Sequence, residues 1–336
     1  MIFDLPNLPK SKEYVDKMTP EQIAVDKCTK KAPLTDADKA ALKESIVFYK
    51  DVFPKLQSID LNTISSDEVI ELRAYLDKVF NVEVMVFNDV QFDLLYRVTI
   101  VAEDFREKGK VRDTKYLKYP PLDIVVKKGV YNRANSHEKT VFYASFFENV
   151  ALRETKPKVG EQIIISTWKN ITGKPFNSYP ITNSNVDNKG AKIATEAFKR
   201  TKEQNDNLFW ELTNQILGFL ASEFVKDCEI LNDNRYEYLY SSYFADKVLA
   251  PFNEEDPTPN YDFVIYPSVA WQHKHDNVAI IPDSVNNKLK PIKAVEYIVE
   301  ETFYEKDLKE DDMPVKLKMI RDSYWIEDDY IIWEDD

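Results

Sequence analysis

The chain has 336 residues, of which 43% are apolar and 13% aromatic, and a formal net charge of −13 at pH 7. This composition excludes a disordered chain and suffices for one large domain with an appendage, or for two domains. The negative charge opposes non-specific binding to the phosphate backbone of DNA or RNA, so we expect no direct nucleic-acid partner. An anionic ligand must therefore meet a local group of arginines.

The sequence predicts a cytoplasmic protein without a membrane segment or a metal. No apolar run reaches the roughly 18 residues that span a bilayer, and residues 1–20 lack the pattern of a signal peptide. Cys28 and Cys228 lie far apart in segments with helical patterns, which argues against a disulfide scaffold or a thiolate metal site. His273 and His275 are separated by a lysine and have no third ligand nearby, so a solvated loop is expected there.

Helices are expected over the first eighty or so residues. Start signals stand at Thr19, Thr35 and Ser65, each followed by acids or a proline in the first turn. Apolar residues recur behind the second and third signals at helical spacing. We therefore predict a helical N-terminal domain over residues 1–85, which supports the remainder, binds a partner or selects a substrate.

Beyond residue 82 the hydrophobic period falls towards two, which is typical of strands. Apolar and polar residues alternate over residues 290–304, which predicts an edge strand. Residues 181–190 are rich in Asn and Ser, which is typical of a loop. The aromatic residues among the acids of residues 325–336 predict that this end docks, either on its own domain or on a partner. Strands are expected at residues 92–101, 140–145, 162–168, 261–266 and 277–282, and helices at 146–154, 207–228 and 236–249.

Three polar residues stand out at or in these apolar segments. Arg97 lies inside a buried strand and must find either a structural carboxylate partner or a ligand anion. Glu154 lies near a helix C-terminus, where the macrodipole disfavours a carboxylate by about 0.3 to 1 kcal/mol; a surface glutamate is the alternative. Ser268 follows Pro267, which ends a strand and lets the hydroxyl face the mouth of a cleft.

Short motifs over residues 92–282 together resemble the RES family, which is named for its Arg, Glu and Ser. The resemblance is tightest over residues 132–154. The motifs are, in chain order, Leu95-Tyr96-Arg97-Val98, Asn132-Arg133-Ala134-Asn135, Val141-Phe142-Tyr143-Ala144-Ser145, Ala151-Leu152-Arg153-Glu154, Tyr266-Pro267-Ser268 and Asn277-Val278-Ala279.

The resemblance implies an α+β fold with an ADP-ribosyltransferase-like RES core and a helical N-terminal extension. The RES-like domain would cover residues 86–304, and an acidic aromatic segment residues 305–336. RES proteins are similar to toxins of toxin–antitoxin pairs that destroy NAD by hydrolysis or phosphorolysis. A helix-turn-helix antitoxin protein is then an implied partner, and inorganic phosphate a possible co-substrate.

Carried over residue by residue, the resemblance implies that Glu154, Arg97 and Ser268 are catalytic. Breaking the nicotinamide–ribose bond develops positive charge at the anomeric carbon, which Glu154 would stabilise. The two arginines would hold the pyrophosphate or an incoming phosphate, Tyr143 would orient the ribose, and Ser268 would bind a phosphate or the carboxamide. The implied substrate-binding residues are Arg133, Tyr143, Asn135, Ser145 and Tyr131.

Two other functions stay open at this point. The same pocket would serve an ADP-ribosyltransferase acting on a macromolecule, or a non-catalytic module that binds NAD or ADP-ribose. NAD is expected as a substrate and no cofactor is expected, in agreement with the missing GxGxxG fingerprint in a chain with six glycines.

Overall fold

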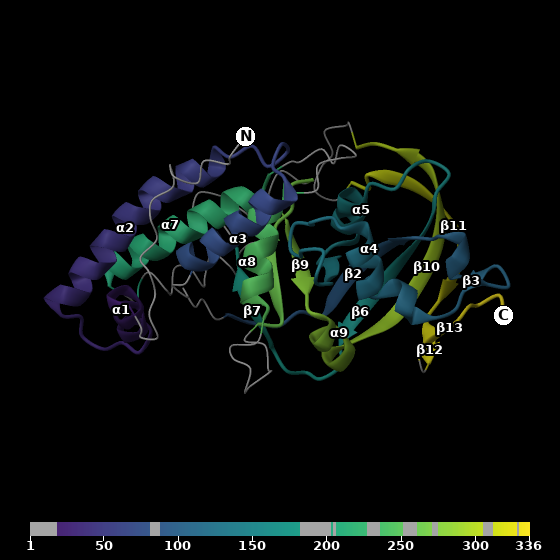
Figure 1. Cartoon of the computed structure of the whole chain (residues 1–336). Coiled ribbons are helices and arrows are strands. Elements are labelled where there is room, and N and C mark those ends of the chain that lie inside the picture. The colour runs from purple at the N-terminus through teal and green to yellow at the C-terminus, as the bar shows by residue number, and fades with distance from the viewer. Residues whose placement is uncertain are drawn as a thin grey trace.

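The computed structural model describes residues 19–80, 88–181, 203, 206–226, 236–250, 261–270, 275–304, 312–327 and 329–336. A large mixed sheet lies beside a group of helices (Figure 1). The chain is thus a mixed α and β structure, which agrees with the expected α+β class. Residues 182–190, Cys228 and His273 lie outside the described residues, so the predictions made for them stay predictions.

Three N-terminal helices begin where the sequence predicts. They are α1 (Pro20–Thr29), α2 (Asp36–Gln57) and α3 (Ser66–Val79). Each starts with a capping box, in which the side chain of Thr19, Thr35 or Ser65 accepts a hydrogen bond from the N3 backbone N–H, and the N3 side chain accepts one from the backbone N–H of that capping residue. These reciprocal bonds satisfy helix-end N–H groups locally, which is why a short sequence pattern finds them.

The N-terminal helices share an apolar core with two later helices, α7 (Asn207–Phe224) and α8 (Leu239–Val248). Helix α2 runs along α7 (Figure 1), and Phe53 stacks on Phe219 with ring centroids 4.3 Å apart. The hydroxyl of Tyr240 donates to the carbonyl of Leu56 at 2.8 Å. The same core reaches one face of the sheet at Tyr266. The helices therefore pack directly against the part of the chain that carries the RES-like motifs, and the boundary near residue 85 stays a prediction.

The main sheet has the strand order β1-β7-β8-β9-β5-β2-β6-β10-β11. Neighbours are antiparallel except β7 and β8, which are parallel. All five strands expected by sequence are present. The bounds in sheet order are Asn88–Val90, Phe176–Pro180, Phe263–Pro267, Asp276–Ile280, Phe142–Ser145, Leu94–Ile100, Gln162–Asn170, Leu289–Thr302 and Val315–Ser323.

Strand β10 was predicted at an edge, and this prediction is wrong. It pairs with β6 on one side and with β11 on the other, where Ala294 lies opposite Ser323. Buried and exposed residues alternate only at the start of β10, and such alternation does not depend on the position of a strand within the sheet.

Short elements surround the sheet. Helix α5 (Glu148–Thr155) covers a small apolar cluster over β2 and β6, and a larger cluster that includes Phe142 and Trp168 fills the sheet face opposite the helices. The remaining elements are α4 (Leu122–Lys128), α9 (Pro282–Lys288), the 3-10 turns η2 (Glu103–Phe105) and η3 (Thr114–Leu117), and the strand pair β3 (Arg106–Glu107) and β4 (Lys110–Val111).

The C-terminal aromatic segment docks on its own chain, which is one of the two predicted alternatives. It forms the hairpin β12 (Trp325–Glu327) and β13 (Tyr330–Ile332). Trp333 is 1% exposed and donates its indole N–H to the carbonyl of Val111 at 2.8 Å. Lys110 and Arg112 hold the carboxylate of Asp336. Within the described residues, no helix is both long and apolar enough to cross a membrane.

Candidate active site

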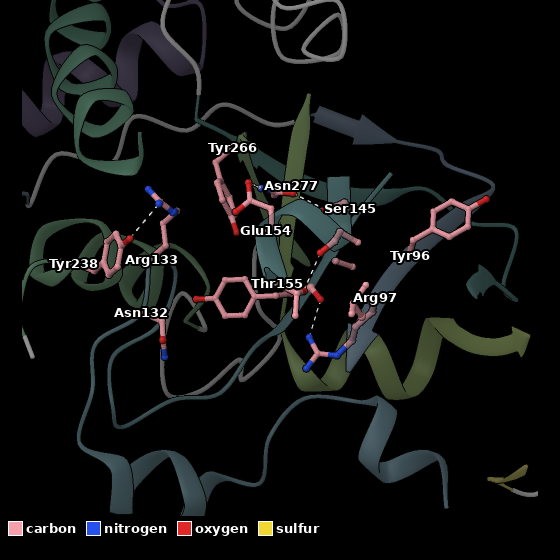
Figure 2. A pocket seen from close by; sticks show the side chains of 14 residues that line it. Tyr96, Arg97, Asn132, Arg133, Ser145, Glu154, Thr155, Tyr238, Tyr266 and Asn277 are labelled. Carbon is pink, nitrogen blue, oxygen red and sulfur yellow. Dashed lines mark hydrogen bonds between the residues drawn. The ribbon is translucent and has the colours of Figure 1, made fainter. Parts of the chain in front are cut away.

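A pocket of about 250 Å³ opens where β8, β9, β5 and β2 lie side by side. Register places Tyr266 opposite Asn277, Asn277 opposite Ser145, and Ser145 opposite Tyr96. Directly opposed residues share one sheet face, so these four residues form a row across the sheet. Figure 2 shows this pocket. Its lining consists of Tyr96, Arg97, Val98, Asn132, Arg133, Tyr143, Ala144, Ser145, Ala151, Glu154, Thr155, Tyr238, Tyr266 and Asn277.

Glu154 enters the pocket from the last turn of α5, as predicted for a helix end. Its Oε1 accepts hydrogen bonds from Ser268 Oγ at 2.5 Å and from Asn277 Nδ2 at 2.8 Å, and both donors are buried. Ser145 Oγ donates to Asn277 Oδ1 at 2.5 Å, which fixes the amide with its NH₂ towards Glu154. Within the described part of the chain, Glu154 Oε2 has no hydrogen-bond partner. These bonds offset the unfavourable helix dipole and leave one oxygen for a ligand.

Arg97 has no carboxylate partner among the described residues, so the structural salt bridge considered from sequence is not found there. Its Nη1 donates to the carbonyl of Tyr143 at 2.7 Å, and its guanidinium lies 5.2 Å from the ring centroid of Phe142. The buried Nε lacks a partner in the same residues. Burial lowers the pKa of Arg97 to about 10, which still leaves it protonated at neutral pH. An uncompensated positive charge therefore lines the pocket.

The position of Arg97 follows from the way β2 and β5 separate. Their ladder consists of the single pair Tyr96 and Ser145. The carbonyl of Tyr143, farther along β5, is bound by the Arg97 side chain. The guanidinium therefore occupies the gap between the two strands, which places it at the pocket without leaving that carbonyl unsatisfied.

Arg133 lines the pocket, but several of its N–H groups donate hydrogen bonds to other parts of the protein. Its Nη1 donates to the carbonyls of Phe224 and Lys226, the latter at 3.1 Å, just beyond the last turn of α7. Its Nη2 donates to the hydroxyl of Tyr238 at 3.1 Å, and the guanidinium stacks on that ring at 4.8 Å. A cation at a helix C-terminus is favourable, so Arg133 fastens α7 to the pocket rim.

Tyr143 lines the pocket with its ring, while its hydroxyl is already occupied. The hydroxyl donates to Asn135 Oδ1 at 2.8 Å and accepts from the N–H of Ala134 at 2.9 Å. Burial raises the pKa of Tyr143, which keeps the phenol protonated. This arrangement fastens the loop before β5 and leaves Tyr143 with a packing contact to offer a ligand.

Asn135 and Tyr131 do not line the pocket. The buried Asn135 amide donates to the carbonyls of Ser136 and Lys139, and Tyr131, 3% exposed, accepts a hydrogen bond from Arg73 at 3.4 Å. Both shape the loop that carries Arg133. Their predicted role in binding substrate stays a prediction, with no support from the lining of the pocket. Ser145 lines the pocket. Ser268 is not part of the lining and donates a hydrogen bond to Glu154.

Sequence reasoning did not select Asn277, Tyr266 or Tyr238 as site residues. Asn277 and Tyr266 stand inside two of the motifs, and their position in consecutive expected strands was the available signal. The prediction that His275 lies in a solvated loop is wrong. It is 3% exposed, its ring packs edge-on against Phe147 at 5.1 Å, and its backbone carbonyl accepts a hydrogen bond from the N–H of Ser268 at 2.7 Å. This bond between the two backbones ties the His275 segment to Ser268.

Among the described residues, no group of three or more His, Cys, Asp or Glu side chains is arranged to hold a metal ion. The chain matches no family model, and neither a curated protein nor a solved structure is significantly similar to it.

Proposed function

We propose that this chain is an NAD-degrading enzyme of the RES type, which cleaves the nicotinamide–ribose bond by hydrolysis or phosphorolysis. One observation carries the proposal. A carboxylate that two buried donors hold by one oxygen shares a pocket with an arginine that has no carboxylate partner in the described residues. A folded core does not require this pair, because Glu154 is exposed at the pocket and Arg97 is a partly buried cation without a counter-charge in the described residues.

The pair suits a reaction with two charges of opposite sign. Departure of nicotinamide leaves an oxocarbenium-like ribose, and Glu154 Oε2 would stabilise it or hold its hydroxyl groups. A preorganised electrostatic contact of this kind typically contributes about 3 to 4 kcal/mol to lowering the barrier. Arg97 would bind the pyrophosphate of NAD or an incoming inorganic phosphate.

The size of the pocket fits part of the substrate. Its volume of about 250 Å³ lies below the ~300 to 1,000 Å³ typical of pockets for drug-sized ligands. We assign it to the nicotinamide riboside half, which contains the bond that breaks. The adenosine half would extend through the mouth. A toxin role and a helix-turn-helix antitoxin partner belong to the same proposal and rest on the resemblance alone.

The test is incubation of the purified chain with NAD, with and without inorganic phosphate, followed by chromatography and mass spectrometry. Free nicotinamide with ADP-ribose supports hydrolysis, and a phosphorylated ADP-ribose that forms only with phosphate supports phosphorolysis. Nicotinamide release that requires an added macromolecule, with label on that macromolecule, favours an ADP-ribosyltransferase instead. Binding of NAD without release of nicotinamide favours a non-catalytic module.

A further inference from the structure

The pocket contains one tyrosine hydroxyl that lies beside Glu154 and has no hydrogen-bond partner among the described residues. The hydroxyls of Tyr143 and Tyr238 take part in the hydrogen bonds described above. Tyr96 lies at the opposite end of the pocket from Tyr238, with its hydroxyl directed away from Glu154 (Figure 2). Tyr266 is 5% exposed, and its hydroxyl makes no hydrogen bond within the described residues.

The surroundings of Tyr266 hold its ring in place. Its ring packs against Phe224 with centroids 5.5 Å apart, and its position opposite Asn277 in the β8–β9 ladder sets its direction. Figure 2 shows the hydroxyl end of Tyr266 beside Glu154. Burial raises the pKa of Tyr266 well above its usual value, and the nearby Tyr143 and Glu154 raise it further. The phenol is therefore a hydrogen-bond donor throughout the physiological pH range.

Among the described residues, the Tyr266 hydroxyl is not one of the side-chain groups that are both shut off from solvent and unpaired, so it faces the open pocket. The ligand is then the natural source of an acceptor. Glu154 Oε2 is itself an acceptor and suits the hydroxyl groups of a ribose. The adjacent Tyr266 is a donor and suits a carbonyl oxygen. The two groups thus complement two different parts of one ligand.

We propose that the Tyr266 hydroxyl is a specificity determinant, which selects ligands with a carbonyl oxygen next to the group held by Glu154. In the reaction proposed above, on which this inference rests, that oxygen belongs to the carboxamide of the nicotinamide half. Tyr266, rather than Tyr143, is then the phenol that contacts the substrate through its hydroxyl.

The test compares wild type with Tyr266→Phe, which removes the hydroxyl and keeps the ring against Phe224. Tyr297→Phe is the control, because it removes a partly buried hydroxyl from β10, outside the pocket. Ligand-observed NMR titrations give the affinities of nicotinamide and of 3-methylpyridine, which has no carbonyl. We expect Tyr266→Phe to bind nicotinamide about 5- to 10-fold more weakly, as for one lost hydrogen bond, and 3-methylpyridine unchanged.

The outcomes separate this inference from the proposed function. Equal nicotinamide affinities for wild type and Tyr266→Phe overturn it, as does wild type that does not bind nicotinamide. An equal loss of 3-methylpyridine binding also overturns it, because the effect is then one of packing. If nicotinamide binds through Tyr266 but wild type leaves NAD intact, the carbonyl contact stands and the NAD-degrading function falls.

Discussion

Ser268 donates a hydrogen bond of 2.5 Å to Glu154, across 114 residues of sequence. Asn277 donates to the same oxygen at 2.8 Å, so both fixed donors act on Oε1. One carboxylate oxygen, Oε1, is held by hydrogen bonds, and the other, Oε2, is open to the pocket. A carboxylate that must face a developing positive charge needs this kind of support, because an unsupported side chain at a helix end would sample several rotamers.

Glu154→Gln should abolish nicotinamide release, with a loss of about 100- to 1,000-fold in kcat. The amide is nearly isosteric and keeps an oxygen that can accept from Ser268 and Asn277, but it removes the negative charge. The measurement is steady-state release of nicotinamide from NAD, with circular dichroism to confirm the fold. Glu148→Gln is the matched control, because it changes the same residue type on the same helix outside the pocket lining. Near wild-type turnover by Glu154→Gln would remove Glu154 from the chemistry.

Ser268→Ala and Asn277→Ala should each lower kcat about 10- to 100-fold and leave KM for NAD within a factor of about two. Each variant removes one hydrogen bond to a charged group, which typically contributes about 1.5 to 3 kcal/mol. We expect a kcat effect because both bonds orient Glu154; Ser268 is not part of the pocket lining, and the Asn277 amide that lines it is bound to Glu154 and Ser145. Asn277→Asp should be worse than Asn277→Ala, since it places a second carboxylate against Glu154. Equal kcat for both Asn277 variants would argue that the residue acts through packing alone.

Arg97→Gln should raise KM for NAD or for phosphate at least tenfold with little loss of stability. The arginine binds one backbone carbonyl and lacks a carboxylate partner in the described residues, so its removal breaks few structural contacts. The measurement pairs steady-state kinetics with urea denaturation. A large drop in the free energy of unfolding with unchanged KM would assign Arg97 to the fold.

Arg133→Ala should lower the free energy of unfolding more, and raise KM less, than Arg97→Gln. Loss of its bonds to Phe224, Lys226 and Tyr238 should lower the free energy of unfolding by about 1 to 3 kcal/mol, since buried acceptors lose a charged donor. The expected rise in KM is smaller than for Arg97→Gln, because fewer of its donors remain for a phosphate. Urea denaturation and NAD kinetics on the same preparations test this ranking. A larger KM effect at Arg133 than at Arg97 would reverse the assignment.

The sequence predicted elements that depend on near neighbours. The three N-terminal helices begin at their capping residues because the N-cap and N3 groups bond each other within one turn. Helix α5 was found from its apolar face, and the five strands from short runs of apolar, β-branched and aromatic residues; β8 and β9 are buried along their whole length. These local signals also placed Glu154 at a helix end and Arg97 in a strand.

The relationships that form the site were not predictable in this way. The row from Tyr266 to Tyr96 depends on the register between β8, β9, β5 and β2, which are separated by long stretches of chain. The missing carboxylate partner of Arg97 is likewise a property of the assembled fold. For the same reason the hydroxyl of Tyr143, expected at the substrate, is instead bound to Asn135. Such pairings become visible only when strands from distant segments are in place.

Asp38→Asn should reduce the stability of the N-terminal helices at neutral pH but not at very low pH. The hydrogen bond from Lys27 and those from Thr35 lower the pKa of Asp38 from 3.8 to about 2. A carboxyl group with a depressed folded-state pKa contributes stability above its unfolded pKa and loses it as the pH falls through the folded value.

Urea denaturation at several pH values should therefore show a constant gap in the free energy of unfolding between wild type and Asp38→Asn above about pH 5. The gap should shrink from about pH 4 as the pH falls through about 2, and below that value both forms carry an uncharged side chain. Asp36→Asn, in the same first turn and outside the capping box, should show a smaller gap. A gap between wild type and Asp38→Asn that persists unchanged at about pH 2 would mean that the charge on Asp38 does not support the start of α2.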